Sequence, residues 1–418
     1  MAGLEDGPPG GLTTADRLEM VEKYQDAWRN LRFAASSPIL SRITPLRMPT
    51  SHSGGVYSRV TANGDVEFCR IGSPIKGRQD MYWMLTRKAT GLAAIGVCDV
   101  DCSQDLVVLS ERTTVDGVFQ HVTVHLRSAA SGFPHPLASR PTLGAYTFLD
   151  ESSIHGDIVA LESKNTDAGL CVHLWNWKSG IMVLNIRSAN SPGVLGCYTF
   201  VDEHHIMVTE HSYLAVHAFD PEAKTPSPPF DSSLSVNIQF SLESNPTRAV
   251  HGMPFQHRLA DSVRLLEVRI GRSRLASCYI CFFLSAVRAC LQQASFTSQT
   301  WFAWEQWGPS GSRALTIPYG MYIALGTLGT KCLFLSWDLE PHCRVVVYEF
   351  NPWVVTGGPD AEQEVVVKHR AFAEPVCSRV RCRIDHWDKI LKDVWSACLT
   401  EDGVVLESKG SELRAYVV

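Results

Sequence analysis

The residues best equipped for chemistry form a short histidine-rich segment. His204, His205 and His211 lie close to Asp202 and Glu203, and imidazole and carboxylate groups are common metal ligands. A loop that folded these side chains together would supply a metal site. The chain contains 15 histidines, however, so a cluster of this size is expected by chance. We therefore expect a solvated loop at this segment and no bound metal.

A second candidate is the Cys-x-x-Cys pair formed by Cys278 and Cys281, with Cys290 further along. A tetrahedral zinc site needs four ligands, usually supplied by two convergent pairs. The apolar run 278–287 (CYICFFLSAV) is typical of a buried strand, and it is too short to span a membrane as a helix. Residues three apart in a strand point to opposite faces. The two sulfurs are thus expected to diverge, and we predict that both are core residues.

Sequence motifs for nucleophilic catalysis and phosphate binding are absent. There is no Gly-x-Ser-x-Gly elbow, no His-Glu-x-x-His helix, and no dinucleotide or Walker fingerprint. The segment 326–331 (GTLGTK) lacks the spacing of a phosphate-binding loop, so we expect a turn between strands. Acidic residues are too numerous for a glycosidase pair to be selected. We expect no catalytic residues and no cofactor, with a glycoside hydrolase as a remote alternative.

Aromatic residues offer binding chemistry instead. The tryptophans at strand ends or turns are Trp175, Trp177, Trp301, Trp304, Trp307, Trp337 and Trp353. Most are expected to fill the space between neighbouring sheets, and a few are expected to anchor a partner at an open face. Trp304 and Trp307, in the WEQWGP segment that we expect to form a turn, are the predicted partner-binding residues.

The elements that must position these residues are mainly strands. From about residue 55 onward, short β-branched and aromatic runs alternate with Gly, Pro, Asn, Asp and Ser. Clear predicted strands are 105–109, 122–126, 157–161, 171–177, 213–219, 331–337 and 345–350. One helical pattern interrupts them: the apolar spacing between Ile384 and Trp395 predicts a short helix.

An internal repeat indicates how the strands are organised. Residues 143–151 (LGAYTFLDE) and 195–203 (LGCYTFVDE) are identical at seven of nine positions, with an offset of 52. Strand pairs that end in an aromatic residue and a turn follow at 174–180 and 216–221, and a similar ending recurs at 347–352. A unit of about 40–50 residues matches a four-stranded propeller blade. The sequence predicts an all-β protein, a β-propeller of about seven blades, although six or eight would also fit.

The N-terminal part has a different pattern. Residues 1–12 are rich in Gly and Pro, and we expect them to be flexible. Thr13 and Asp16 form a capping-box pattern, and Leu18, Val21, Tyr24, Trp28 and Leu31 recur at helical spacing. We predict an amphipathic helix over 13–34, which either packs on the body or links it to another module, and a propeller over 35–418.

Composition narrows the class of partner. The net charge is -5, from 38 basic and 43 acidic residues, which gives no reason to expect nucleic acid. The 13 cysteines are scattered, and the N-terminus lacks the pattern of a secretion signal. We expect reduced thiols, a cytoplasmic or nuclear location, no membrane partner and a protein as the main partner.

Four segments resemble a known family, the fungal F-box proteins with a propeller-like, WD-repeat-like region after the F-box. They are 14–33 (TADRLEMVEKYQDAWRNLRF), 156–180, 304–313 (WEQWGPSGSR) and 345–352 (VVVYEFNP). The resemblance implies a region that selects substrates for a cullin-RING ubiquitin ligase. The F-box itself is not in this chain, so binding to the ligase adaptor is expected only if an F-box is encoded upstream. The alternative is an autonomous scaffold propeller unrelated to ubiquitin.

Overall fold

In the computed structural model of the chain, the described residues are 1–418 apart from 1–3, 7–10, 41–50, 54–55, 116–117, 147–148, 166–168, 190–197, 211–212, 227–229, 234–237, 241–254, 258–260, 269–277, 298–300, 316–321, 340–341, 352–364, 369–374, 388–390, 393 and 409–412. Among these residues, no helix has both the length and the apolar character needed to cross a membrane.

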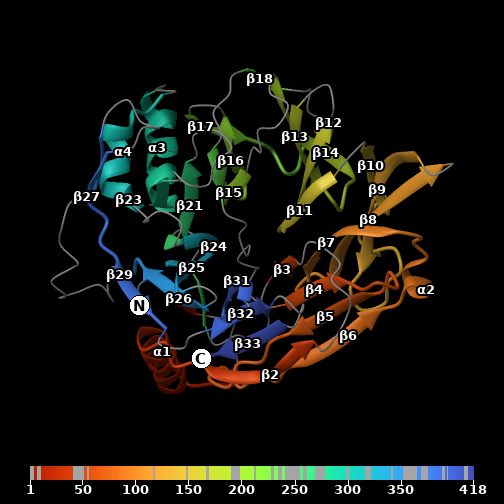
Figure 1. Ribbon diagram of the computed structural model, residues 1–418. Helices are drawn as coiled ribbons and strands as arrows, with labels where there is room; N and C mark the ends of the chain where they lie inside the picture. Colours follow the sequence, from red (N-terminus) through yellow and green to blue (C-terminus); the bar gives the residue numbers. More distant parts are fainter. Residues whose placement is uncertain are drawn as a thin grey trace.

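The protein is mostly β, and its larger sheets follow one another along the chain (Figure 1). Sheet 1 contains β3 (Ser51–Ser53), β4 (Val56–Val60), β5 (Val66–Arg70) and β6 (Met81–Leu85). Sheet 2 contains β7 (Ile95–Asp101), β8 (Leu106–Val115), β9 (Val118–Ser128) and β10 (Thr142–Tyr146). Sheet 3 contains β11 (Leu149–His155), β12 (Ile158–Asn165), β13 (Gly169–Asn176), β14 (Ile181–Ala189) and β18 (Phe230–Ser233).

The second half of the chain continues this order. Sheet 4 contains β15 (Tyr198–Asp202), β16 (His205–Glu210) and β17 (Tyr213–Ala218). Sheet 5 contains β19 (Ile238–Phe240), β21 (Val263–Val268), β22 (Cys278–Phe283) and β23 (Ser312–Leu315). Sheet 6 contains β24 (Tyr322–Leu328), β25 (Lys331–Leu339), β26 (His342–Glu349) and β29 (Arg383–His386), with β30 (Leu391–Lys392) also on β26. Sheet 7 contains β31 (Val394–Thr400), β32 (Gly403–Ser408), β33 (Leu413–Val417) and β2 (Ala34–Leu40).

The remaining elements are short strand pairs and helices. β1 (Leu4–Asp6) pairs with β20 (Phe255–His257), and β27 (Val365–Val367) pairs with β28 (Val376–Ser378). The helices are α1 (Thr14–Arg29), α2 (Arg87–Thr90), α3 (Leu284–Thr297) and α4 (Trp304–Gly311). The seven predicted strands are confirmed, because they overlap β8, β9, β12, β13, β17, β25 and β26. Successive small sheets of mainly antiparallel strands are consistent with the predicted propeller.

One backbone hydrogen bond recurs from sheet to sheet. The residue after the third strand donates its N–H to a carbonyl between the first and second strands, at N···O distances of 2.8–3.0 Å in six sheets. The pairs are Ala129 to Asp105 (2.8 Å), Trp177 to Asp157 (3.0 Å), Phe219 to His204 (2.8 Å), Leu284 to Ser262 (3.0 Å), Phe350 to Thr330 (2.8 Å) and Val418 to Asp402 (2.8 Å). The aromatic residues predicted to end each unit, Trp177, Phe219 and Phe350, are therefore in equivalent positions.

Both faces of the inner strands are buried, which explains their continuous apolar runs. In β8, Leu106 and Val108 pack toward sheet 3, whereas Val107 and Leu109 pack toward sheet 1. The same alternation joins each sheet to the next. The clusters between successive sheets contain Phe68 and Val100 (1 and 2), Leu126 and Leu161 (2 and 3), Leu174 and Ile206 (3 and 4), Met207 and Ile280 (4 and 5), Leu265 and Phe334 (5 and 6), and Val345 and Leu399 (6 and 7).

The last sheet also contacts the first. Val405 and Val417 of sheet 7 share a buried cluster with Tyr57 and Ile71 of sheet 1. The outer strand of sheet 7 is β2, from the N-terminal part of the chain, which pairs antiparallel with β33. Two segments that are far apart in the sequence thus complete one sheet.

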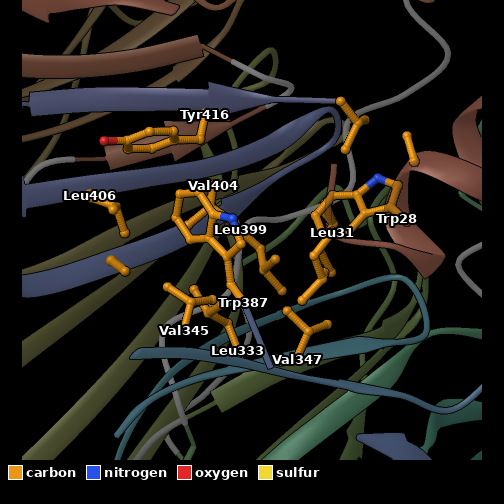
Figure 2. Packing of buried hydrophobic residues seen from close by; sticks show 14 of the residues in the cluster. Trp28, Leu31, Leu333, Val345, Val347, Trp387, Leu399, Val404, Leu406 and Tyr416 are labelled. Carbon is orange, nitrogen blue, oxygen red and sulfur yellow. The ribbon is translucent and has the colours of Figure 1, made fainter. Parts of the chain in front are cut away.

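The N-terminal helix begins where the sequence predicts. The Thr13 hydroxyl accepts from the Asp16 N–H (3.2 Å) and the Asp16 carboxylate accepts from the Thr13 N–H (2.9 Å), which completes the capping box. Figure 2 shows Trp28 and Leu31 beside core residues of sheets 6 and 7. The predicted stripe is largely correct, but Leu18 is 47% exposed.

Some local predictions are wrong. The described residues of the segment Ile384–Trp395 lie in β29, β30 and the start of β31 instead of a helix, because β29 and β30 pair with β26 and the apolar residues Trp387, Leu391 and Val394 pack between sheets 6 and 7. The WEQWGP segment lies in α4, and the run 278–287 changes from strand to helix after Phe283. Leu4–Asp6, within the segment expected to be flexible, forms β1.

The repeat marks the passage from one sheet to the next. In its first copy, Leu143 belongs to β10, the last strand of sheet 2, and Leu149 begins β11, the first strand of sheet 3. In its second copy, the described residues lie in β15, the first strand of sheet 4, and in the turn after it. Both copies therefore enter a sheet at its first strand.

Candidate interaction surface

The described part of the histidine-rich segment forms the turn between β15 and β16 of sheet 4, with His205 in β16, and not the predicted solvated loop between neighbouring sheets. The Asp202 carboxylate accepts from the His204 N–H and contacts Nδ1 of His205, both at 2.8 Å. Partial burial raises the pKa of Asp202, but these hydrogen bonds and the electrostatic attraction of His205 and Arg288 together lower it more, so the net shift is downward. His211 lies outside the described residues. Within the described ranges, no group of three or more His, Cys, Asp or Glu side chains is arranged to hold a metal ion.

The two cysteines of the Cys-x-x-Cys pair diverge, as predicted. Cys278 packs between sheets 4 and 5, whereas Cys281 packs between sheets 5 and 6 and lies 3.5 Å from Cys332, measured between the sulfurs. Burial raises the pKa of the Cys278 thiol to about 12. Both are core residues, and their position on opposite faces of β22 prevents them from sharing a ligand.

The lysine of the GTLGTK segment has a structural role that the sequence did not predict. The turn at Gly329 and Thr330 joins β24 to β25, with Gly329 at φ +54°. Lys331 follows the turn, and its Nζ lies 3.1 Å from Glu349 and 5.0 Å from the centre of the Trp28 ring. The segment thus holds α1 instead of a phosphate.

A second buried ionic group also lies against α1. Lys76 lies 2.8 Å and Arg78 lies 2.7 Å from carboxylate oxygens of Asp402. The Tyr24 hydroxyl donates to the carbonyl of Glu401, and Lys76 also lies 5.3 Å from the centre of the Tyr24 ring. Charged residues from the loop between β5 and β6 and from the turn between β31 and β32 therefore meet at one helix. The aromatic stripe of α1 was the sequence signal for this contact.

The surface that carries the predicted partner-binding residues is a helical insertion in sheet 5. The chain leaves β22, forms α3 and α4, and returns as β23 (Figure 1). Arg288 of α3 donates two hydrogen bonds, of 3.1 and 2.7 Å, to the carbonyl of Val201 in sheet 4. The hairpin of β27 and β28 lies beside α4, and the N–H of Arg379 donates to the carbonyl of Pro309. We call α3, α4, β27 and β28 the helical insert.

Trp304 and Trp307 lie on α4, and both are half-buried. Their ring centres are 5.0 Å apart in an edge-on arrangement, and the Trp307 ring is 6.1 Å from that of Phe282. The indole N–H of Trp304 donates to the carbonyl of Cys377 (3.3 Å). The Trp304 ring also fills the space over Gly308, where a Cβ would lie 2.3 Å from it. The structure places both rings against the core of the insert, and partner binding by them stays a prediction.

Two other aromatic side chains of the insert face solvent. Phe296 on α3 is 87% exposed and Trp301, just before α4, is 64% exposed. They belong to a segment of 16 residues, 289–304, that contains no Asp, Glu, Lys or Arg. Trp301 was one of the tryptophans expected at strand ends or turns, but neither Trp301 nor Phe296 was predicted to bind a partner. The absence of charge around these residues was a signal that could have identified both.

Comparisons with known proteins give little further guidance. No protein-family model matches the chain, and no curated protein matches it. Solved structures that are weakly similar include two of propeller-like fold, BamB and Sqt1, and one designed protein. BamB from Moraxella catarrhalis is 12% identical (TM-score 0.36), and the match covers 88% of this chain and 82% of BamB. The designed protein Ika8 is 10% identical (TM-score 0.38), and the match covers 88% of this chain and 95% of Ika8. Sqt1 from Chaetomium thermophilum is 10% identical (TM-score 0.39), covering 87% of this chain and 81% of that one.

Proposed function

We propose that this protein is a protein-interaction module without catalytic activity, built as a β-propeller of seven blades, and that the helical insert binds its partner. Sheets 1 to 7 are the proposed blades. The buried clusters between successive sheets, the cluster between sheets 7 and 1, and the completion of sheet 7 by β2 support a closed ring.

The observation that carries the binding proposal is the exposure of Phe296 and Trp301 on an uncharged segment. An isolated exposed aromatic side chain is common on protein surfaces, but two of them on one uncharged segment of the chain are typical of a binding site. The few residues that contribute most of the binding energy at protein interfaces are also enriched in Trp and Tyr, together with Arg. The insert is held to sheets 4 and 5 through Arg288 and the Trp304 ring, so these residues are presented on a packed support.

The chemistry of the surface indicates the chemistry of the partner. A segment without charged residues offers no ion pair, so a highly charged partner surface would lose hydration without compensation. We therefore expect an apolar protein surface, such as the apolar face of an amphipathic helix. Trp304 and Trp307 would then support the contact by fixing α4 against Phe282.

Site-specific photo-cross-linking in cells that express the chain would test the proposal. A benzoylphenylalanine residue replaces Phe296 in one variant and Leu18, which is 47% exposed on α1, in a matched control. We expect a discrete protein adduct from position 296 and none of the same mass from position 18. Adding Trp301→Ser to the first variant should reduce the adduct at least several-fold.

The same adducts at both positions, or no adduct at position 296, would contradict the proposal. Thermal unfolding of each variant provides the control for folding. Because Phe296 and Trp301 are exposed, their replacement should leave the unfolding temperature almost unchanged.

A narrower proposal follows from the resemblance to fungal F-box proteins. In this form, the module selects substrates for a cullin-RING ubiquitin ligase in the cytoplasm or nucleus, where free thiols such as the described cysteines persist. Extending the chain with any F-box encoded upstream should make it co-purify with the ligase adaptor. Failure of this extended protein to bind the adaptor, while the adduct at position 296 persists, would leave a scaffold module unrelated to ubiquitin.

A further inference from the structure

The outer edges of the sheets differ in how they are protected. An exposed edge strand presents unpaired N–H and C=O groups that can pair with another chain, and proteins block such edges with charges, Pro, bulges or additional strands. Most outer edges in the described ranges have one of these features. β14 is covered by β18, β10 contains an irregular register at Leu143 and Ala145, β29 contains the ion pair Arg383–Asp385, and β2 contains Pro38 and two register shifts.

Two outer strands in the described ranges, β17 of sheet 4 and β6 of sheet 1, have none of these features. Leu214 and Val216 of β17 pack on the cluster between sheets 4 and 5, so the exposed apolar edge is that of β6. Its sequence, Met81–Leu85 (MYWML), contains neither a charge nor a Pro. Its pairing with β5 runs from Val66 and Leu85 to Arg70 and Met81 without a register shift. In the part of the chain that the structure describes, no strand pairs with its outer edge. β6 is therefore a flat, apolar and unprotected edge.

The side chains of β6 add an apolar surface to this edge. Met81, Tyr82 and Met84 are 43, 48 and 49% exposed. Tyr82 and Met84 share one face of the strand, while Trp83 points to the other face and stacks on Phe68 at a distance of 5.0 Å between the ring centres. Trp83 also donates its indole N–H to the carbonyl of Ala129 (3.1 Å), which fixes the strand against sheet 2.

A neighbouring loop extends the same apolar region. The loop after β9 begins at Ala129, the residue that Trp83 contacts, and it reaches α2, since a Cβ on Gly132 would lie 3.4 Å from Ala89. Phe133, the next residue, is 67% exposed. The loop that contacts Trp83 thus carries a further exposed aromatic side chain.

We propose that β6 is a self-association edge, at which the β6 strand of a second copy of this chain pairs antiparallel about a twofold axis through Trp83. In this register Tyr82 lies opposite Met84 of the second copy, and the contact occurs twice. Such aromatic–aliphatic pairs stabilise adjacent antiparallel strands, and no like charges are brought together. The edge is complementary to itself, which is the requirement of a twofold interface. This inference is independent of the function proposed for the helical insert.

Sedimentation velocity of the full chain over a range of concentrations would test the proposal. We expect the wild-type protein to change from monomer to dimer as the concentration rises, because a five-residue strand pair forms only a small interface. The double variant Y82K/M84K places lysines opposite lysines in the proposed register, so it should be monomeric over the same range.

A charge-swap variant tests the register itself. In Y82K/M84E, each lysine lies opposite a glutamate of the second copy, so dimer formation should return. The matched control is Phe296→Lys, which charges an exposed aromatic residue elsewhere and should leave the dimer intact. Thermal unfolding of all variants shows whether each one folds.

Three results would overturn the proposal. They are a wild-type protein that stays monomeric at every concentration, a dimer that persists in a folded Y82K/M84K variant, and a folded Y82K/M84E variant that stays monomeric. Loss of the dimer in Phe296→Lys alone would instead place self-association on the helical insert and would also contradict pairing through β6.

Discussion

The N-terminal helix α1 and the helical insert of sheet 5 are both added to a body of small sheets, but they are attached in different ways. Four of the aromatic and aliphatic side chains that α1 directs toward the body, Val21, Tyr24, Trp28 and Leu31, are no more than 6% exposed. The insert buries one side of Trp304 and Trp307 and leaves Phe296 and Trp301 in water.

The polar contacts differ in the same way. Under α1, Lys331 and Lys76 lie near the aromatic rings. Lys331 is paired with Glu349 at the end of β26, and Lys76 is paired with Asp402 in the turn between β31 and β32. The insert is held to sheet 4 by the two hydrogen bonds from Arg288 to the carbonyl of Val201, whereas the hydrogen bond from Trp304 to Cys377 joins α4 to β28 within the insert. We conclude that α1 closes the structure where sheets 6 and 7 meet, whereas the insert presents a surface.

The largest expected difference between the two regions concerns their tryptophans. Trp28→Ala removes a ring that is 4% exposed and packed on sheets 6 and 7, so we expect a loss of about 3–5 kcal/mol in the free energy of unfolding. Trp301→Ala removes a ring that is 64% exposed, so the change should stay within about 0.5 kcal/mol. Urea unfolding of both variants measures this. Equal losses would contradict the proposed difference in attachment.

A smaller effect is expected from the buried charges under α1. Asp402→Ala leaves Lys76 and Arg78 with Glu401 as their neighbouring carboxylate, at 3.6 and 3.8 Å. Breaking a buried ion pair costs about 3–5 kcal/mol, and the remaining carboxylate places the expected loss near the lower limit, about 3 kcal/mol.

The matched control for this prediction is Glu19→Ala. Glu19 pairs with Lys23 on the exposed face of α1, where both side chains are more than 60% exposed at 64 and 63%. An exposed pair of this kind contributes about 0.3–0.5 kcal/mol. Chemical denaturation of both variants would separate buried from exposed charges, and a small effect of Asp402→Ala would show that α1 is held by its apolar contacts alone.

The same comparison shows how far the sequence alone can predict this protein. The strands were predictable because both faces of a sandwiched strand are apolar, as in 105–109 and 345–350. The capping box and the apolar stripe predicted α1, because these signals are local. Local signals failed where a strand passes directly into a helix, because α3 continues the apolar run of β22 without a break in composition.

The contacts that define the candidate sites were not predictable. Lys76, Lys331 and Asp402 are ordinary charged residues in the sequence, and only the meeting of three distant turns at α1 gives them a buried role. The choice of Trp304 and Trp307 identified the correct segment, but the sequence did not show that α4 turns their rings inward. Exposure depends on packing between elements that are far apart in the chain.

The smallest expected effect distinguishes the two regions by pH. Burial raises the pKa of Tyr24 well above its usual value of about 10, and the nearby carboxylates Asp402 and Glu401 raise it further. Above pH 10 the unfolded chain therefore releases this proton while the folded protein retains it, so the stability that depends on Tyr24 decreases as pH rises. In Tyr24→Phe this contribution is absent.

The measurement is the difference in the free energy of unfolding between wild type and Tyr24→Phe, taken from pH 8 to pH 11. The variant loses the hydrogen bond to Glu401 at every pH, so only the change of the difference with pH reports the tyrosine proton. We expect the advantage of the wild type to decrease by about 1.4 kcal/mol over this range, which corresponds to one proton over one pH unit above the unfolded pKa. All other titrating groups are shared by the two proteins and cancel. A difference that does not vary with pH would mean that the Tyr24 ring is reached by water and that α1 is attached no more tightly than the insert.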